Sequence, residues 1–102
     1  MMEINYEHLK RLKLSIQSAL LGAITENIRN VAVDISKNKI MLYFYIDGKI
    51  SDDDKENISI IETEVIADFE DDFDIESIIK RVDFPVPIVL NRGYSVFQRK
   101  ER

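Results

Sequence analysis

The stretch of the sequence with the most distinctive chemistry is ETEVIADFEDDFDIE, residues 62–76, which contains eight carboxylates and no base. Carboxylates at this density can coordinate a hard cation, transfer protons in catalysis, or attract a basic partner. A calcium loop of the EF-hand type needs glycine at its sixth position and glutamate at its twelfth. Counted from Asp68, these positions hold Phe73 and Ile79. The sequence therefore predicts no metal site, and nothing in it predicts a cofactor.

The chain lacks the combinations of residues that usually carry out catalysis. There is one histidine, His8, and there is no cysteine, nucleophile-elbow motif or glycine-rich phosphate loop to accompany it. The clustered carboxylates repel one another and have no apolar pocket that would separate two pKa values. We therefore predict that the protein is not an enzyme, and we interpret His8 as a surface residue.

The charge of the chain is distributed unevenly. Residues 51–76 hold twelve of the nineteen acids and one base, Lys55, which gives this segment a net charge of −11 and the rest of the chain +6. Phosphates would be repelled by the acidic segment, and the bases elsewhere have no pattern of a recognition helix or an RNA-binding strand. We expect no nucleic-acid ligand. Two interpretations of the acidic residues remain. They could form a surface for a basic partner, or they could form a solvated face that keeps the domain soluble.

Length and composition indicate one globular domain over residues 1–102, because 102 residues with 45% hydrophobic content can bury a core. The longest apolar run, residues 40–46, is too short to span a membrane, and the first residues lack the pattern of a signal peptide. The absence of cysteine fits a reducing compartment. We expect a cytoplasmic protein that does not bind membranes.

Local patterns predict the first four elements of structure. Apolar residues at spacings of three and four predict a helix over residues 6–21, which Gly22 would end. Alternation over residues 30–35 and the apolar run 40–46 predict a β-hairpin. The second run is apolar or amphipathic on both faces, which is typical of an interior strand. Ser51 is the predicted N-cap of a second helix, whose first turn holds three aspartates.

Two more strands are predicted over residues 75–84 and 94–99, and residues 98–102 are interpreted as a frayed end. The resulting order is α-β-β-α-β-β. This order suits an α+β fold in which two helices pack on one face of a four-stranded antiparallel sheet. The other face would then be open, and Tyr43 and Tyr45 would lie on it.

Four strings occur in the order ALLGAITENIRNVAVDI, IMLYFYIDGKISDDD, ETEVIADF and KRVDFPVPI between residues 19 and 88. With these strings the chain resembles a family of small bacterial proteins classed as contact-dependent growth inhibition (CDI) immunity proteins. The branch that it resembles is similar to inhibitors of a ribonuclease A-like toxin domain. Members of such families neutralise one cognate toxin, and some occur as orphan genes. The residues that match the family pattern are Leu21, Gly22, Tyr43, Asp47, Gly48, Glu64, Asp68, Phe69, Asp83 and Pro85.

The resemblance implies that a basic toxin domain is the partner, and it gives the acidic residues a physical role. Carboxylates can occupy a basic cleft that is built for phosphates, while aromatic side chains anchor the complex. The predicted partner-binding residues are Glu64, Asp68, Glu70, Asp71, Asp72, Asp74, Tyr43 and Tyr45. The alternative is a non-catalytic adaptor or structural homodimer that uses the open sheet face, so both monomer and homodimer remain open.

Overall fold

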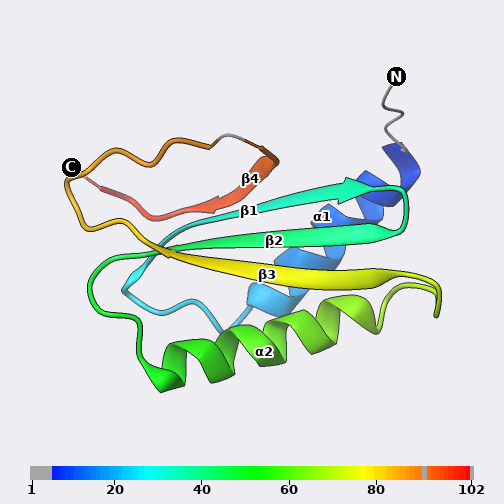
Figure 1. Cartoon of the computed structure of the whole chain (residues 1–102), viewed down its shortest axis with the longest axis horizontal. Coiled ribbons are helices and arrows are strands. Elements are labelled where there is room, and N and C mark those ends of the chain that lie inside the picture. Colours follow the sequence, from blue (N-terminus) through cyan, green and yellow to red (C-terminus); the bar gives the residue numbers. More distant parts are fainter. Residues whose placement is uncertain (1–5, 91, 102) are drawn as a thin grey trace.

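The computed structural model describes residues 6–90 and 92–101, which form two helices and four strands (Figure 1). In chain order the elements are α1 (Tyr6–Leu20), β1 (Ile28–Ser36), β2 (Lys39–Ile46), α2 (Asp52–Ile66), β3 (Asp74–Arg81) and β4 (Tyr94–Gln98). The predicted α+β class and the α-β-β-α-β-β order are confirmed.

The end of α1 and the start of α2 lie where local chemistry predicts them. Gly22, which follows α1, has a φ of +78°, a conformation that glycine adopts without a steric cost. At the start of α2, the Asp54 backbone N–H donates to Ser51 Oγ at 3.1 Å, and the Ser51 backbone N–H donates to Asp54 Oδ2 at 2.9 Å. This reciprocal pair is a capping box, which satisfies two N–H groups that the helix leaves unpaired.

The sheet has the strand order β3-β2-β1-β4, so β2 is an interior strand as predicted. Strand β1 is antiparallel to both β2 and β4, whereas β2 and β3 are parallel. The prediction of an all-antiparallel sheet is therefore wrong at this pair. The physical reason is that α2 returns the chain to the end of the sheet where β2 began, so that β3 starts in the same direction.

Strands β3 and β4 lie at opposite edges of the sheet, so the chain between them must cross from one edge to the other. Figure 1 shows this connection passing around the end of the sheet where β2 and β3 end. The Val82 backbone N–H donates to Ile46 O at 2.9 Å, which fixes the connection at its start. Strand β3 accordingly ends at Arg81, three residues before the predicted end.

The core is one hydrophobic cluster that joins both helices to β1 and β2. Its buried members are Leu9, Leu12, Ile16, Ala19, Leu20, Ile28, Val31, Val33, Ile35, Ile40, Leu42, Phe44, Ile46, Ile58, Ile61, Val65 and Phe69. The strand residues alternate along β2, so that Tyr43 falls outside the cluster. The shared cluster favours the prediction that both helices cover the same face of the sheet. Neither helix in the described part of the chain is long and apolar enough to span a membrane.

Candidate functional site

The acidic stretch of the sequence spans the end of α2, the turn that follows it and the start of β3. We call six residues of this region the acidic corner: Glu64, Asp68, Glu70, Asp71, Asp72 and Asp74. Phe69, within the turn, is only 8% exposed and belongs to the core, and Phe73 and Ile75 pack against that core. The rings of Phe69 and Phe73 lie 5.0 Å apart. The carboxylates are thus carried by a backbone that apolar side chains anchor.

Helix α1 fixes one side of the acidic corner. Ser15 Oγ donates to Asp68 Oδ2 at 2.6 Å, and the two terminal nitrogens of Arg11 donate to the Glu70 carboxylate at 3.1 and 3.3 Å. The Arg11 guanidinium also lies 4.7 Å from the centre of the Phe69 ring. Hydrogen bonding from Arg11 lowers the pKa of Glu70, so Glu70 is already neutralised within the molecule.

The β1–β2 turn fixes the other side of the corner. Asn38 Nδ2 donates to Asp72 Oδ2 at 2.7 Å. Lys39 Nζ lies 3.4 Å from Asp74 Oδ2 and 3.2 Å from Glu76 Oε1, and its hydrogen bond with Glu76 is the main cause that raises the pKa of Lys39. Asp74 is therefore paired with a cation, whereas Asp72 has only an uncharged partner.

Most of the charge in the acidic corner is not compensated. Within the described residues, the four members that form no ion pair are Glu64, Asp68, Asp71 and Asp72. All four residues are exposed. Residues 6–90 and 92–101 contain no group of histidine, cysteine, aspartate and glutamate side chains that could hold a metal ion. The arrangement instead presents four accessible negative charges, one on the last turn of α2 and three on the turn that follows it.

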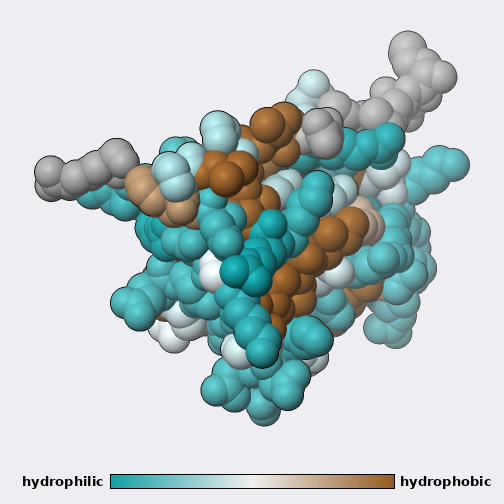
Figure 2. Space-filling model, turned by 60° about the vertical axis from the view of Figure 1, so that its left-hand side comes forward, coloured by the Kyte–Doolittle hydropathy of each residue, from teal (hydrophilic) through white to brown (hydrophobic). Residues whose placement is uncertain are grey.

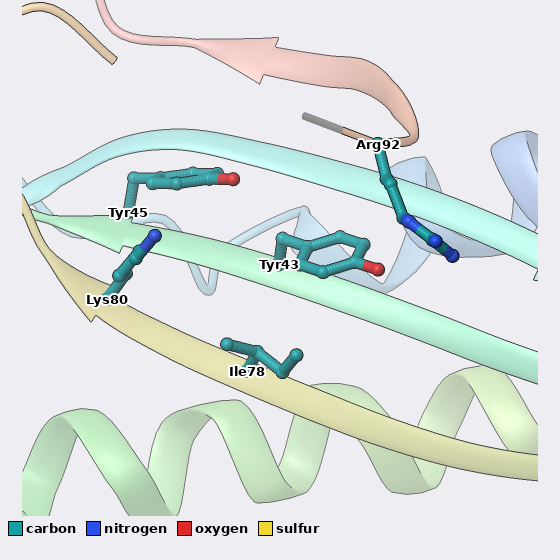
Figure 3. A pocket seen from close by; sticks show the side chains of 5 residues that line it. All are labelled: Tyr43, Tyr45, Ile78, Lys80 and Arg92. Atoms are coloured by element: carbon teal, nitrogen blue, oxygen red, sulfur yellow. The ribbon is translucent and has the colours of Figure 1, made fainter. Parts of the chain in front are cut away.

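The two tyrosines of the predicted site line a hollow of about 390 Å³ on the sheet (Figure 3). We call it the tyrosine hollow; its lining residues are Tyr43, Tyr45, Ile78, Lys80 and Arg92. Ile78 is 40% exposed, whereas Tyr45 is only 7% exposed and its pKa is raised mainly by burial. Tyr43 is half-buried. The expectation that both tyrosines stand on an open face therefore fits Tyr43 better than Tyr45.

One member of the acidic corner, Asp74, lies on the same face of β3 as the tyrosine hollow. Asp74, Ile78 and Lys80 are at alternate positions of β3, and all three are exposed. Residues at alternate positions of a strand point to the same face, and four residues of strand span about 13 Å. One partner surface of ordinary size could contact the corner and the hollow together.

A second group of charged residues, which the sequence did not predict, lies at the end of the sheet where β2 ends. Arg29 is only 4% exposed. It donates to Val82 O at 2.8 Å, to Val86 O at 2.7 Å, and through two nitrogens to the Glu101 carboxylate at 2.7 and 2.8 Å. The hydrogen bonds from Arg29 lower the pKa of Glu101 to about 2. The chain end near Glu101, interpreted from the sequence as frayed, is thus anchored.

The residues Asp47, Asp83 and Arg99 extend this group, and with Arg29 and Glu101 they form what we call the Arg29 network. Gly48 N–H donates to Asp83 Oδ1 at 2.7 Å, and Phe84 N–H donates to Asp47 Oδ1 at 3.1 Å. Arg99 Nη2 donates to Asp47 Oδ2 at 3.0 Å. Three residues of the family pattern, Asp47, Gly48 and Asp83, therefore hold the β3–β4 connection in place. A lone arginine in an apolar strand was the available sequence signal for this network.

The connection that the Arg29 network holds carries exposed apolar side chains. Val86 and Val89 are 54% and 70% exposed, and Phe84 is 40% exposed. Figure 2 turns this side of the molecule toward the reader and shows brown hydrophobic side chains among teal hydrophilic ones. Val86 and Val89 line a second depression together with Tyr45 and Lys80, so the apolar surface continues from the tyrosine hollow.

Comparison with known protein families identifies this chain's sequence type. The sequence model of the MafI2 immunity protein family matches residues 9–101. No curated protein matches the chain. The matched range contains the acidic corner, the tyrosine hollow and the Arg29 network.

Proposed function

Because the chain belongs to the MafI2 immunity protein family, we propose that it neutralises a cognate toxin by binding it through the acidic corner. The observation that carries this proposal is that Glu64, Asp68, Asp71 and Asp72 are exposed and form no ion pair with described residues. A partner cation can meet these carboxylates without displacing an internal one. Long-range attraction to the corner would also accelerate the encounter.

The chemistry of the acidic corner favours a toxin with a basic cleft. We propose a nuclease, in which lysine and arginine side chains bind the phosphates of the substrate. Carboxylates of the immunity protein would pair with these cations and exclude the nucleic acid from the cleft. Such inhibition is stoichiometric, and the immunity protein itself would catalyse no reaction.

Charge alone gives a fast encounter but not a durable complex, since binding energy concentrates in a few aromatic and apolar anchors. The adjacent tyrosine hollow supplies such a surface through Tyr43 and Ile78, which are accessible side by side on β2 and β3. We propose that the corner steers the toxin and that the hollow anchors it.

The decisive experiment measures binding to a cognate toxin domain, which is to be sought among the genes next to the one for this protein. The double variant Asp71→Lys/Asp72→Lys should lower the affinity at least about tenfold at low salt, and the loss should shrink as salt screens the charges. The matched control is Asp53→Lys/Glu56→Lys, which makes the same change of charge on exposed residues of α2. Unchanged affinity of the corner variant at low salt would refute the acidic-corner mechanism. Equal losses in both doubles would show that only net charge matters.

The alternative, a structural homodimer, draws support from the exposed apolar side chains of Ile78, Val86 and Val89. Apolar patches of this kind often mark contacts between proteins. Size-exclusion chromatography with light scattering would distinguish the two functions. A stable dimer that Ile78→Asp converts to monomer would assign the sheet face to self-association and leave only the acidic corner for a toxin.

A further inference from the structure

The tyrosine hollow has the opposite charge to the acidic corner. Two of its five lining residues, Lys80 and Arg92, are cations in a chain whose net charge is −5. Neither forms an ion pair with any described residue. By contrast, the other arginines of the described residues, Arg11, Arg29, Arg81 and Arg99, are all paired with carboxylates, whereas Lys80 is one of several lysines that form no ion pair. The cations of the hollow are thus available to a ligand.

The geometry of the hollow places the two cations around an aromatic and aliphatic floor. Lys80 is paired in register with Tyr45, and Ile78 with Tyr43. Figure 3 shows Lys80 beside Tyr45 and Arg92 on the side of Tyr43, so the cations approach from two ends of the hollow. A volume of about 390 Å³ accommodates one or two side chains of a partner.

We propose that the tyrosine hollow receives an aspartate or glutamate side chain of the toxin, with a neighbouring apolar side chain packed against Tyr43 and Ile78. This inference rests on the proposed function, since it names a second contact in the same complex. Lys80 supplies a mobile point charge, and Arg92 supplies the planar group that can bind a carboxylate through two hydrogen bonds. The phenol of Tyr45, which also lines the hollow, can donate a hydrogen bond to the carboxylate.

Two adjacent contacts of opposite sign would determine the orientation of the toxin. The acidic corner requires cations on the partner, and the hollow, whose Ile78 lies about 13 Å along β3 from Asp74, requires an anion. A related toxin with the same basic cleft but no carboxylate at this place would leave Lys80 and Arg92 covered and unpaired. Covering unpaired charges is unfavourable, so the hollow would discriminate among toxins that the corner alone attracts.

The first test uses the full chain and a small carboxylate, so that it does not depend on the toxin. Phenylacetate, titrated into the labelled protein, should shift the NMR signals of Tyr43, Ile78, Lys80 and Arg92. The uncharged isostere phenylacetamide should bind at least about threefold more weakly, because it lacks the charge that the two cations recognise. Equal shifts from both compounds, or no shifts at the hollow, would overturn the proposal.

The second test uses the cognate toxin domain of the binding experiment proposed above. Lys80→Glu should weaken binding at least about tenfold, and Lys80→Gln should weaken it less, because it removes the charge without reversing it. The matched control Lys55→Glu makes the same charge reversal on an exposed residue of α2 and should change affinity less than about twofold. Circular dichroism would verify that each variant folds.

The outcomes separate this inference from the proposed function. If the wild type fails to bind the toxin, the proposed function is wrong, and the fragment titration still decides whether the hollow takes a carboxylate. If the wild type binds and Lys80→Glu binds equally well, the inference is wrong and the proposed function stands. If Lys80→Glu instead dissociates a homodimer of the chain, the hollow belongs to a second copy and the inference is likewise overturned.

Discussion

The acidic corner and the Arg29 network are both built from charged side chains, but they differ in where those charges find partners. In the Arg29 network, the buried guanidinium of Arg29 meets two backbone carbonyls and the Glu101 carboxylate. In the acidic corner, four exposed carboxylates meet no internal cation among the described residues. Charges that are satisfied within the molecule stabilise it, whereas unpaired charges at the surface are available to a partner.

This difference separates residues that match a family pattern into two groups. Asp47 and Asp83 accept hydrogen bonds from the backbone of a neighbouring segment, and therefore act on the fold. Glu64 accepts no such bond within the described residues and is exposed. Mutations in the network should therefore lower stability, and mutations in the corner should lower toxin binding at nearly constant stability.

The largest expected effect on stability comes from Arg29→Met, which keeps much of the side-chain volume but removes the charge. The variant leaves the Val82 and Val86 carbonyls without their donor and leaves Glu101 paired with Arg99 alone, so unfolding by urea should show a loss of about 3–4 kcal/mol. The control Arg81→Met removes an exposed arginine that is paired with Asp83 and should cost much less. Equal small losses would mean that the network does not stabilise the fold.

Phe69→Ala should produce the next largest effect, because Phe69 is the buried anchor beneath the acidic corner. A loss of about 3 kcal/mol is expected from the apolar contacts and the cavity that remains. Toxin affinity should also fall, although every carboxylate is retained, since the corner would lose its fixed geometry. Phe84→Ala, the same substitution at a more exposed site, is the control. Undiminished affinity of a folded Phe69→Ala protein would show that a fixed corner is not needed.

Acid should weaken the Arg29 network through Glu101. The pKa of Glu101 is lowered from its ordinary 4.5 to about 2 in the folded protein. The ionised form is therefore favoured by folding, which gives stability that is present above pH 4.5 and lost as the pH falls toward 2. The stability difference between the wild type and Glu101→Gln should shrink over this interval in thermal melts. A difference that stays constant from pH 6 to pH 2 would contradict the pairing.

Much of the fold was predictable because its signals are local. The spacing of apolar residues in α1 and the Ser51 cap of α2 each depend on a few neighbouring residues, and both are confirmed. The direction of β3 was not predicted correctly, because strand direction depends on the path of the whole connection. The strand–helix–strand order of β2, α2 and β3 was nevertheless a usable signal, since a helical crossover commonly joins parallel strands.

Only the local features of the candidate site were predictable from the sequence. The sequence shows where the acids are dense, but it does not show which of them are compensated. Glu70 is neutralised by Arg11, which is 59 residues away, and Asp72 is contacted by Asn38, which is 34 residues away. Arg92 and Lys80 come together with Tyr43 only because the sheet brings β2, β3 and the start of β4 to one face. Such pairings depend on tertiary structure and have no local pattern.

The smallest expected effect on stability comes from Asp71→Asn, a substitution in the acidic corner. Asp71→Asn removes one exposed carboxylate that has no internal cation, while neighbouring acids repel it, so the free energy of unfolding should change by less than about 0.5 kcal/mol. Toxin affinity should fall nonetheless, and the fall should be larger at low salt. The companion variant Glu70→Gln should have the opposite effect, because Glu70 already forms an ion pair with Arg11. It should lower stability more than it lowers toxin affinity. If Asp71→Asn lowers stability without lowering toxin affinity, Asp71 stabilises the fold and does not bind the toxin. The proposed toxin-binding carboxylates would then centre on Glu64 and Asp68.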